Sequence, residues 1–157
     1  MTRVHLVTDA IVLRPLAFPQ DEAAFMAHLR ALYPSISEDT LRIRLENVRQ
    51  GSWECIVALE GNGAAKMAGM SGYWIQHRLC YGRFLYVDHF IVSDVVRSRG
   101  VGNLMWRELE RIARESGCTR IVLDTYVTNS VAQRFWMNQG CNVVGFHFGK
   151  PLEGSDS

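Results

Sequence analysis

The chain has 157 residues, of which 48% are hydrophobic, and its 17 Lys and Arg against 16 Asp and Glu leave a net charge of +1. This length and apolar content suit a single domain with its own core, so we expect one domain over residues 1–157. The charge balance argues against nucleic acid or an anionic membrane as a partner, and no apolar run approaches the roughly 18 residues that cross a bilayer. The cysteines form no C-x-x-C pair, and the N-terminus shows no secretion signal. We therefore expect a cytoplasmic protein with a small-molecule partner.

The first half of the chain predicts one strand, two helices and three further strands. A strand near residues 10–16 precedes a helix that begins near Pro19, with apolar residues at helical spacing. Ser35, three residues before Glu38, has the spacing of a capping box and predicts the start of a second helix, which Gly51 ends. Strand-like runs follow at residues 53–60, 66–76 and 84–92. Three strands in succession indicate an antiparallel meander.

The second half of the chain alternates between helix and strand patterns. From Val101 the apolar period changes to 3.6 residues, which predicts a helix that ends at Gly117. We then expect a strand at 120–127, a short helix at 130–140 and a final strand at 142–149. A strand, helix and strand in succession form a right-handed crossover between parallel or neighbouring strands. The fold class is therefore α/β or α+β, with a mixed sheet.

The segment RSRGVGN, residues 97–103, lies between a predicted strand and a predicted helix. Such a turn exposes main-chain N–H groups at the positive end of the helix dipole, which suits phosphate oxygens. Gly100 and Gly102 would let the main chain approach such a ligand, while Arg97 and Arg99 would add positive charge. The alternative is an ordinary glycine turn with two solvated arginines. The segment lacks the Lys-Ser/Thr pair of a P-loop and the third glycine of a dinucleotide-binding fingerprint.

A second motif, NSVAQRFW followed by QGC, begins at Asn129. Together with the R-x-x-G-x-G pattern of residues 97–102 and the order of the predicted elements, it resembles the GCN5-related N-acetyltransferase (GNAT) superfamily over nearly the whole chain. The resemblance implies a GNAT-like mixed, mostly antiparallel twisted sheet flanked by about four helices. It also implies an enzyme that moves an acetyl group from acetyl-CoA to an amine by direct attack.

The resemblance further implies where acetyl-CoA would bind. Its pyrophosphate would contact main-chain N–H groups of residues 98–103, and its pantetheine arm would follow the strand end at residues 90–92, where two strands splay apart. The cofactor-binding residues carried over in this way are Phe90, Ile91, Val92, Arg97, Ser98, Arg99, Gly100, Val101, Gly102, Asn103, Asn129, Ala132 and Phe135. From the residues alone, Asn129 also fits a helix N-cap, and Ala132 and Phe135 have core spacing.

Asp88 and His89, within the strand LYVDHFIV, are the candidate catalytic residues. A primary amine is mostly protonated at neutral pH, so a carboxylate or an imidazole must take its proton, directly or through water, before the nitrogen attacks. Strand alternation predicts Tyr86, Asp88 and Phe90 on one face and Leu85, Val87, His89 and Ile91 on the other. Asp88 is the first candidate for the base or the amine anchor, and His89 is the second. Either side chain alternatively only satisfies a polar neighbour.

No proton donor for the departing thiolate follows from the sequence. The tyrosine that often serves this purpose in the family aligns with Trp136, whose indole N–H is no acid at accessible pH. Tyr86, Tyr126, Cys141 or water would have to replace it, or the thiolate leaves without assistance. The histidines are scattered along the chain, and no metal site is expected.

The sequence indicates the chemical class of the amine substrate but not its identity. Residues 72–94 resemble diamine acetyltransferases, whereas the ending GFHFGKPL resembles aminoalkylphosphonate acetyltransferases. Tyr33, Trp74 and Tyr86 are the candidate acceptor-site residues, although the first two also fit core or edge positions. We expect a small primary amine as substrate. The alternatives are a protein or peptide N-acetyltransferase and a catalytically silent acyl-CoA-binding module, and a homodimer would be common for the family.

Overall fold

The computed structural model describes residues 5–8, 11–61, 66–94 and 100–153, and for 5–8 the backbone only. Its contacts divide the chain into two compact units, residues 1–123 and 124–157, each of which is described by itself. The expectation of one domain over the whole chain is not tested by this division and stays a prediction. No helix among the described residues is long and apolar enough to cross a membrane.

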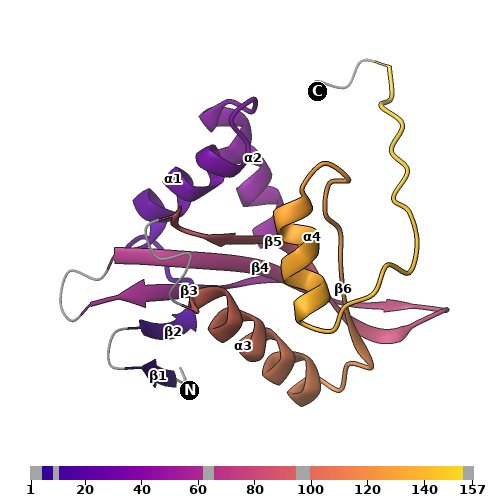
Figure 1. Ribbon diagram of the computed structural model, residues 1–157. Helices are drawn as coiled ribbons and strands as arrows, with labels where there is room; N and C mark the ends of the chain where they lie inside the picture. Colours follow the sequence, from indigo (N-terminus) through magenta and orange to yellow (C-terminus); the bar gives the residue numbers. More distant parts are fainter. Residues whose placement is uncertain (1–4, 9–10, 62–65, 95–99, 154–157) are drawn as a thin grey trace. The chain divides into compact units, whose positions relative to one another are not determined.

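The first unit contains a six-stranded sheet with its strands in sequence order (Figure 1). The strands are β1 (His5–Thr8), β2 (Ile11–Pro15), β3 (Trp53–Glu60), β4 (Lys66–Arg78), β5 (Gly82–Val92) and β6 (Arg120–Leu123). The neighbours from β1 to β5 pair antiparallel, whereas β5 and β6 pair parallel. The α/β class with a mixed, mostly antiparallel sheet is therefore confirmed. Strand β1 was not predicted, and β6 is shorter than the expected strand at 120–127.

The helices of the first unit are α1 (Glu22–Leu32), α2 (Glu38–Arg49) and α3 (Val101–Glu115). The N-cap of α2 is Ser37, whose side chain accepts a hydrogen bond of 3.2 Å from the Thr40 main-chain N–H. The expectation of a cap at Ser35 was wrong, because a capping oxygen must directly precede the first helical residue to reach the first-turn N–H groups. At the far end of α3, Gly117 has a φ of +70°, as a helix stop requires.

The two faces of this sheet are covered by different helices. Figure 1 shows α1 and α2 on one side of the sheet and α3 on the other. Phe25 and Leu29 of α1 and Leu41 of α2 pack with Trp53 and Met70 in one buried cluster. We call the sheet surface beneath this cluster the α1/α2 face. The opposite surface, the α3 face, is covered by the strongly amphipathic α3, whose most buried residues include Val101, Met105 and Leu109.

The second unit contains α4 (Ser130–Asn138) and an extended C-terminal segment. The Asn129 side chain caps α4 by accepting a hydrogen bond of 3.0 Å from the Ala132 main-chain N–H. The final strand expected at 142–149 was wrong: the described residues there belong to no strand, and Val144, Phe146 and Phe148 are exposed. Alternating apolar residues give a segment the composition of a strand, but a strand also needs a hydrogen-bonding partner.

Candidate functional site

The two halves of β5 have different neighbours. Phe84 to Val87 pair with β4 on one side and with β6 on the other. The pairing with β6 ends at Val87 opposite Leu123, where β6 itself ends, while β5 continues to Val92 beside β4. Among the described residues, the segment 88–92 therefore pairs with β4 and not with β6, and the expected splay of two strands around the cofactor stays a prediction.

Asp88 is the extra residue of a β-bulge at the junction between these halves. Tyr73 pairs with Val87 and Gly72 pairs with His89, so Asp88 has no opposite residue on β4. A bulge shifts the alternation of side chains by one residue. His89 consequently shares the α1/α2 face with Gly72, whereas Val87 shares the α3 face with Tyr73. The predicted alternation, which grouped Val87 with His89, was wrong because the bulge lies between them.

His89 is buried on the α1/α2 face, with 7% of its surface exposed. Its ring centroid lies 6.1 Å from that of Phe25 and 6.0 Å from that of Trp53. Its Nδ1 atom is 3.6 Å from Oδ2 of Asp88, whose side chain is 40% exposed. Of the two candidate catalytic residues, Asp88 is thus accessible to a substrate, whereas His89 is buried next to Asp88.

Beyond the bulge, successive main-chain groups of β5 point alternately toward β4 and away from it. The Ser93 N–H donates a hydrogen bond of 2.8 Å to the Ala68 carbonyl, and the Ile91 carbonyl lies 2.7 Å from where a Cβ on Gly69 would be. Both groups therefore point toward β4. Because backbone direction alternates along a strand, the main-chain groups of Phe90 and Val92 point to the other side.

Gly100 forms the N-cap of α3 with a left-handed backbone at φ +78°. Its carbonyl accepts the first helical hydrogen bond from the Leu104 N–H at 3.1 Å, no side chain caps the helix, and the first turn holds no acidic residue. The N–H groups of a first helical turn and the helix dipole attract anions. Val101 and Gly102 are buried in this turn, and Asn103 is exposed. The predicted residues Arg97, Ser98 and Arg99 lie outside the described residues.

The candidate acceptor residues Tyr33, Trp74 and Tyr86 belong to the α1/α2 side of the first unit. Trp74 pairs in register with Tyr86, so these two share a face. Tyr33 is the C-cap of α1, and both Tyr33 and Trp74 pack against the core cluster while staying partly exposed. The α1/α2 side of the first unit therefore carries aromatic side chains from α1, β4 and β5.

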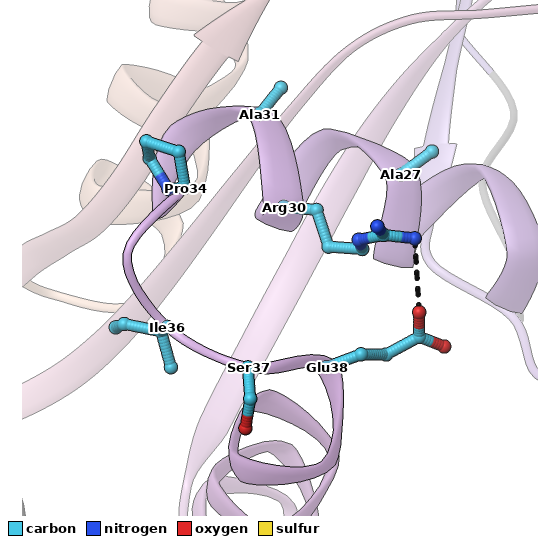
Figure 2. A pocket seen from close by; sticks show the side chains of 7 residues that line it. All are labelled: Ala27, Arg30, Ala31, Pro34, Ile36, Ser37 and Glu38. Carbon is cyan, nitrogen blue, oxygen red and sulfur yellow. Dashed lines mark hydrogen bonds and ion pairs between the residues drawn. The ribbon is translucent and has the colours of Figure 1, made fainter.

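A separate hollow of about 590 Å³ lies at the connection from α1 to α2 (Figure 2). It is lined mainly by Ala27, Ala31, Pro34 and Ile36, and the Arg30–Glu38 ion pair of 3.1 Å lies beside them. None of the candidate catalytic, cofactor or acceptor residues lines it. Among the described residues, no three His, Cys, Asp or Glu side chains gather as metal ligands.

Three titratable groups near the core have shifted pKa values. Burial raises the pKa of the Cys55 thiol well above its ordinary range, and the negative charges of Asp21 and Asp88 add to the effect. Hydrogen bonds from the Arg14 guanidinium lower the pKa of Asp21. Burial, followed by the hydrogen bond to Glu54, raises the pKa of Tyr73. Cys55 is consequently a thiol at neutral pH and no nucleophile.

The remaining candidate residues lie in the second unit. Asn129 acts as the N-cap of α4, so the structural alternative for this residue is confirmed. Phe135 is half-buried, and its ring meets that of Trp136 edge to face with centroids 4.8 Å apart. Trp136 is buried, whereas Tyr126 is 78% exposed. Asn129, Ala132 and Phe135 thus share one short helix and its cap.

The sequence profile of the Acetyltransferase (GNAT) family matches residues 22–141. The chain belongs to this family. The match includes the end of β5, the start of α3 and all of α4, and it spans the boundary between the two units. The protein is accordingly an N-acetyltransferase of the GNAT type, a family whose members use acetyl-CoA.

Individual relatives agree with this assignment. Glucosamine 6-phosphate N-acetyltransferase 1 of Oryza sativa subsp. japonica is 26% identical over 122 residues, which cover 74% of this chain and 73% of the relative. The aminoglycoside N-acetyltransferase AAC(6')-Iy in complex with CoA matches with a TM-score of 0.79 at 15% identity, over 95% of this chain and 99% of that one. Glucosamine-6-phosphate N-acetyltransferase from Arabidopsis thaliana matches with a TM-score of 0.70 at 20% identity, over 91% and 99%. These structures show that the fold is shared.

Sequence reasoning missed Trp53 and Gly72, which border His89. A Cβ on Gly72 would lie 2.4 Å from His89 Cε1 and 2.7 Å from Trp53 Nε1, so only glycine leaves room for both rings. Glycine within a strand often marks a bulge or a close approach, and Gly72 carried that signal.

Proposed function

We propose that this GNAT enzyme transfers the acetyl group of acetyl-CoA to the primary amine of a small molecule. The observation that carries the proposal is the bulge at Asp88, which presents an accessible carboxylate where the pairing of β5 with β6 ends. The same face holds aromatic side chains, and the following helix begins without an acidic residue. A carboxylate, an apolar wall and an anion-binding helix end are what an amine and a nucleotide-linked thioester need.

The residues of the first unit fit acetyl-CoA at two places. The pyrophosphate is held by N–H groups of the turn that leads through Gly100 into α3, with Arg97, Ser98 and Arg99 contributing as the family motif implies. The pantetheine arm lies along the edge of β5, where we assign the contacts to the main chain of Phe90 and Val92. Ile91 serves instead to anchor this edge to the core, because its side chain packs against the α1/α2 cluster. In the second unit, Asn129, Ala132 and Phe135 line the cofactor by the same resemblance.

Asp88 binds the substrate ammonium and takes its proton. An alkylammonium has to lose a proton before its nitrogen can attack, and a positioned carboxylate provides both attraction and a proton acceptor. Trp74, Tyr86 and Tyr33 bind the carbon skeleton, and aromatic faces also attract a cation. Acetyl-CoA, when bound, supplies the thioester whose acetyl group is transferred.

The relatives support a small amine over a protein substrate. Two of the proteins similar to this chain are named for glucosamine 6-phosphate, and one for aminoglycosides. All three names describe amino sugars. An amino sugar is therefore the first substrate class to test, ahead of the diamines and aminoalkylphosphonates that the sequence suggests.

The proposal is tested by measuring acetyl-CoA binding and then CoA release. Calorimetry should show saturable binding of acetyl-CoA below millimolar concentration. CoA release is then followed with amino sugars, diamines, aminoalkylphosphonates and peptides that carry a free N-terminus or a lysine. Turnover with a small amine supports the proposal, whereas turnover with peptides alone favours the protein N-acetyltransferase. Binding of acetyl-CoA without turnover on any amine would indicate a silent acyl-CoA-binding module.

A further inference from the structure

Two buried nitrogen atoms beside the candidate site have no hydrogen-bonding partner among the described residues. They are Nε1 of Trp53 on β3 and Nε2 of His89 on β5, each with less than 1 Å² of exposed surface. Buried polar atoms in proteins nearly always have a partner, because leaving one without a hydrogen bond forfeits the interaction that it made with water. Two such atoms from neighbouring rings therefore point to a ligand that both can share.

The geometry brings the two rings together over Gly72. Trp53 and His89 belong to the strands on either side of β4, and both rings approach the position where a Cβ on Gly72 would be. The ring centroids of Trp53 and His89 are 6.0 Å apart, and Phe25 closes the cluster 6.1 Å from each of them. The buried cluster to which Trp53 and Phe25 belong is mainly apolar, so the described side chains offer these two nitrogens few polar partners.

The hydrogen-bonding properties of Asp88, His89 and Trp53 determine which hydrogen bonds the shared ligand must donate and accept. The Asp88 carboxylate, 3.6 Å from His89 Nδ1, only accepts hydrogen bonds, so it favours the imidazole form that carries its proton on Nδ1. In that form Nε2 is an acceptor. The indole Nε1 of Trp53 is only a donor. The shared ligand must accept from Trp53 and donate to His89, which an ammonium group or a metal ion cannot do and a water molecule can.

We propose that Trp53 and His89 bind one buried water and that this site holds His89 in the Nδ1–H form that faces Asp88. Trp53 and His89 are then positioning residues behind the carboxylate that meets the amine. The water holds the imidazole in place, and the Nδ1–H that faces the Asp88 carboxylate at 3.6 Å attracts this carboxylate and orients its side chain. The kinetic consequence rests on the proposed function, whereas the water site and the ring form do not.

The first test needs no substrate. In the ¹⁵N-labelled full chain, long-range ¹H–¹⁵N spectra report which ring nitrogen of His89 carries the proton, and His89→Gln identifies the signal among those of the five histidines. We expect the Nδ1–H form, together with a magnetisation-transfer peak between the Trp53 indole N–H and a bound water. Trp53→Phe keeps a ring but removes the N–H, so it should shift the population toward the Nε2–H form. An Nε2–H form in the wild type, or an unchanged ring form in Trp53→Phe, would overturn the proposal.

A matched variant and a kinetic measurement separate positioning from stability. Trp106 is buried on α3, under the other face of the sheet, and Trp106→Phe should leave the His89 signal unchanged even if it lowers stability. Trp53→Phe should reduce kcat about two- to tenfold, the value of one hydrogen bond, with KM for acetyl-CoA unchanged. A loss of kcat as large in Trp106→Phe would overturn the positioning role. Failure to acetylate any amine would remove the proposed function and leave the ring-form result standing.

Discussion

The two halves of β5 differ in their purpose: the first belongs to the core of the sheet, and the second carries the candidate site. The half from Phe84 to Val87 has strand partners on both sides, and its core residues Phe84 and Leu85 are fully buried. Among the residues that the structure describes, the half from Asp88 to Val92 pairs with β4 alone, and it contains the bulge and the main-chain edge at which we place the cofactor. A strand paired on both sides has its backbone groups committed, whereas one that loses a partner can offer them to a ligand.

The comparison separates changes that affect binding and chemistry from those that affect folding alone. Substitutions around the second half of β5 and the start of α3 should alter acetyl-CoA or amine recognition at nearly constant stability, except at Gly72, where an added methyl group also displaces buried rings. Substitutions in the remaining core should do the opposite. The following predictions test this separation, from the largest expected effect to the smallest.

Gly100→Glu should reduce acetyl-CoA affinity at least about 100-fold, because it places a negative charge where we propose that the pyrophosphate binds. A Cβ at Gly100 meets no atom of the described residues within 4 Å, so a clash with these residues is not the cause, although φ +78° strains any side-chain-bearing residue. Gly117→Glu is the matched control, since Gly117 has φ +70° and open space at the other end of α3. Calorimetry should show normal binding for the control. Equal losses in both variants would attribute the effect to strain rather than to charge.

Asp88→Asn should lower kcat by about 100-fold or more, the usual contribution of a positioned proton acceptor, and leave acetyl-CoA binding intact. The amide keeps the size of the side chain but can neither attract an ammonium group nor take its proton at neutral pH. Steady-state rates with a small amine, alongside calorimetry, separate the two effects. Asp39→Asn, at an exposed position in the first turn of α2, provides the control and should keep full activity. Wild-type turnover of Asp88→Asn across the whole pH range would exclude Asp88 from the mechanism.

Local sequence patterns predicted most elements of this fold. The apolar period of α3 located its start at Val101, and the run WECIVALE coincides with β3. These patterns succeed because each depends on residues that are neighbours along the chain. The family motifs are equally local, which is why they indicated the GNAT family and acetyl-CoA from the sequence alone.

The features that the sequence did not reveal depend on cross-strand register. The bulge at Asp88 exists because the pairs Gly72–His89 and Tyr73–Val87 are adjacent on β4 but leave one extra residue between them on β5. No pattern within β5 alone reveals this extra residue. The contact of Trp53 and His89 over Gly72 likewise joins three strands. The apolar alternation in residues 142–149 was misleading for the same reason, because it says nothing about a pairing partner.

Gly72→Ala should destabilise the fold by about 1–3 kcal/mol and also lower turnover, because the added methyl group must displace the His89 and Trp53 rings. Gly69→Ala is the matched control on the same strand. Its Cβ would lie 2.7 Å from Met105 Sδ and the Ile91 carbonyl, so it should destabilise by a similar amount and weaken acetyl-CoA binding at the β5 edge, without moving His89. Urea denaturation gives the stability of each variant, and rates with saturating acetyl-CoA give the turnover. If both variants lose turnover equally, the α1/α2 face has no special part in the chemistry.

Asp21→Asn should have the smallest effect and change stability alone. Asp21 accepts hydrogen bonds of 2.6 and 2.7 Å from Arg14, which lower its pKa below the ordinary 3.8. A lowered pKa stabilises the folded state above the pKa of the unfolded chain, and this stability is lost as the pH falls through the folded-state value. Wild type should therefore lose stability below about pH 4, whereas Asp21→Asn starts about 1 kcal/mol lower at neutral pH and loses less on acidification. Urea midpoints between pH 3 and 7 measure both slopes, with Asp39→Asn retaining the wild-type slope. Because Arg14 belongs to β2, which β3 and β4 separate from β5 in the sheet, any loss of acetyl transfer at neutral pH in folded Asp21→Asn would contradict the division between the two regions.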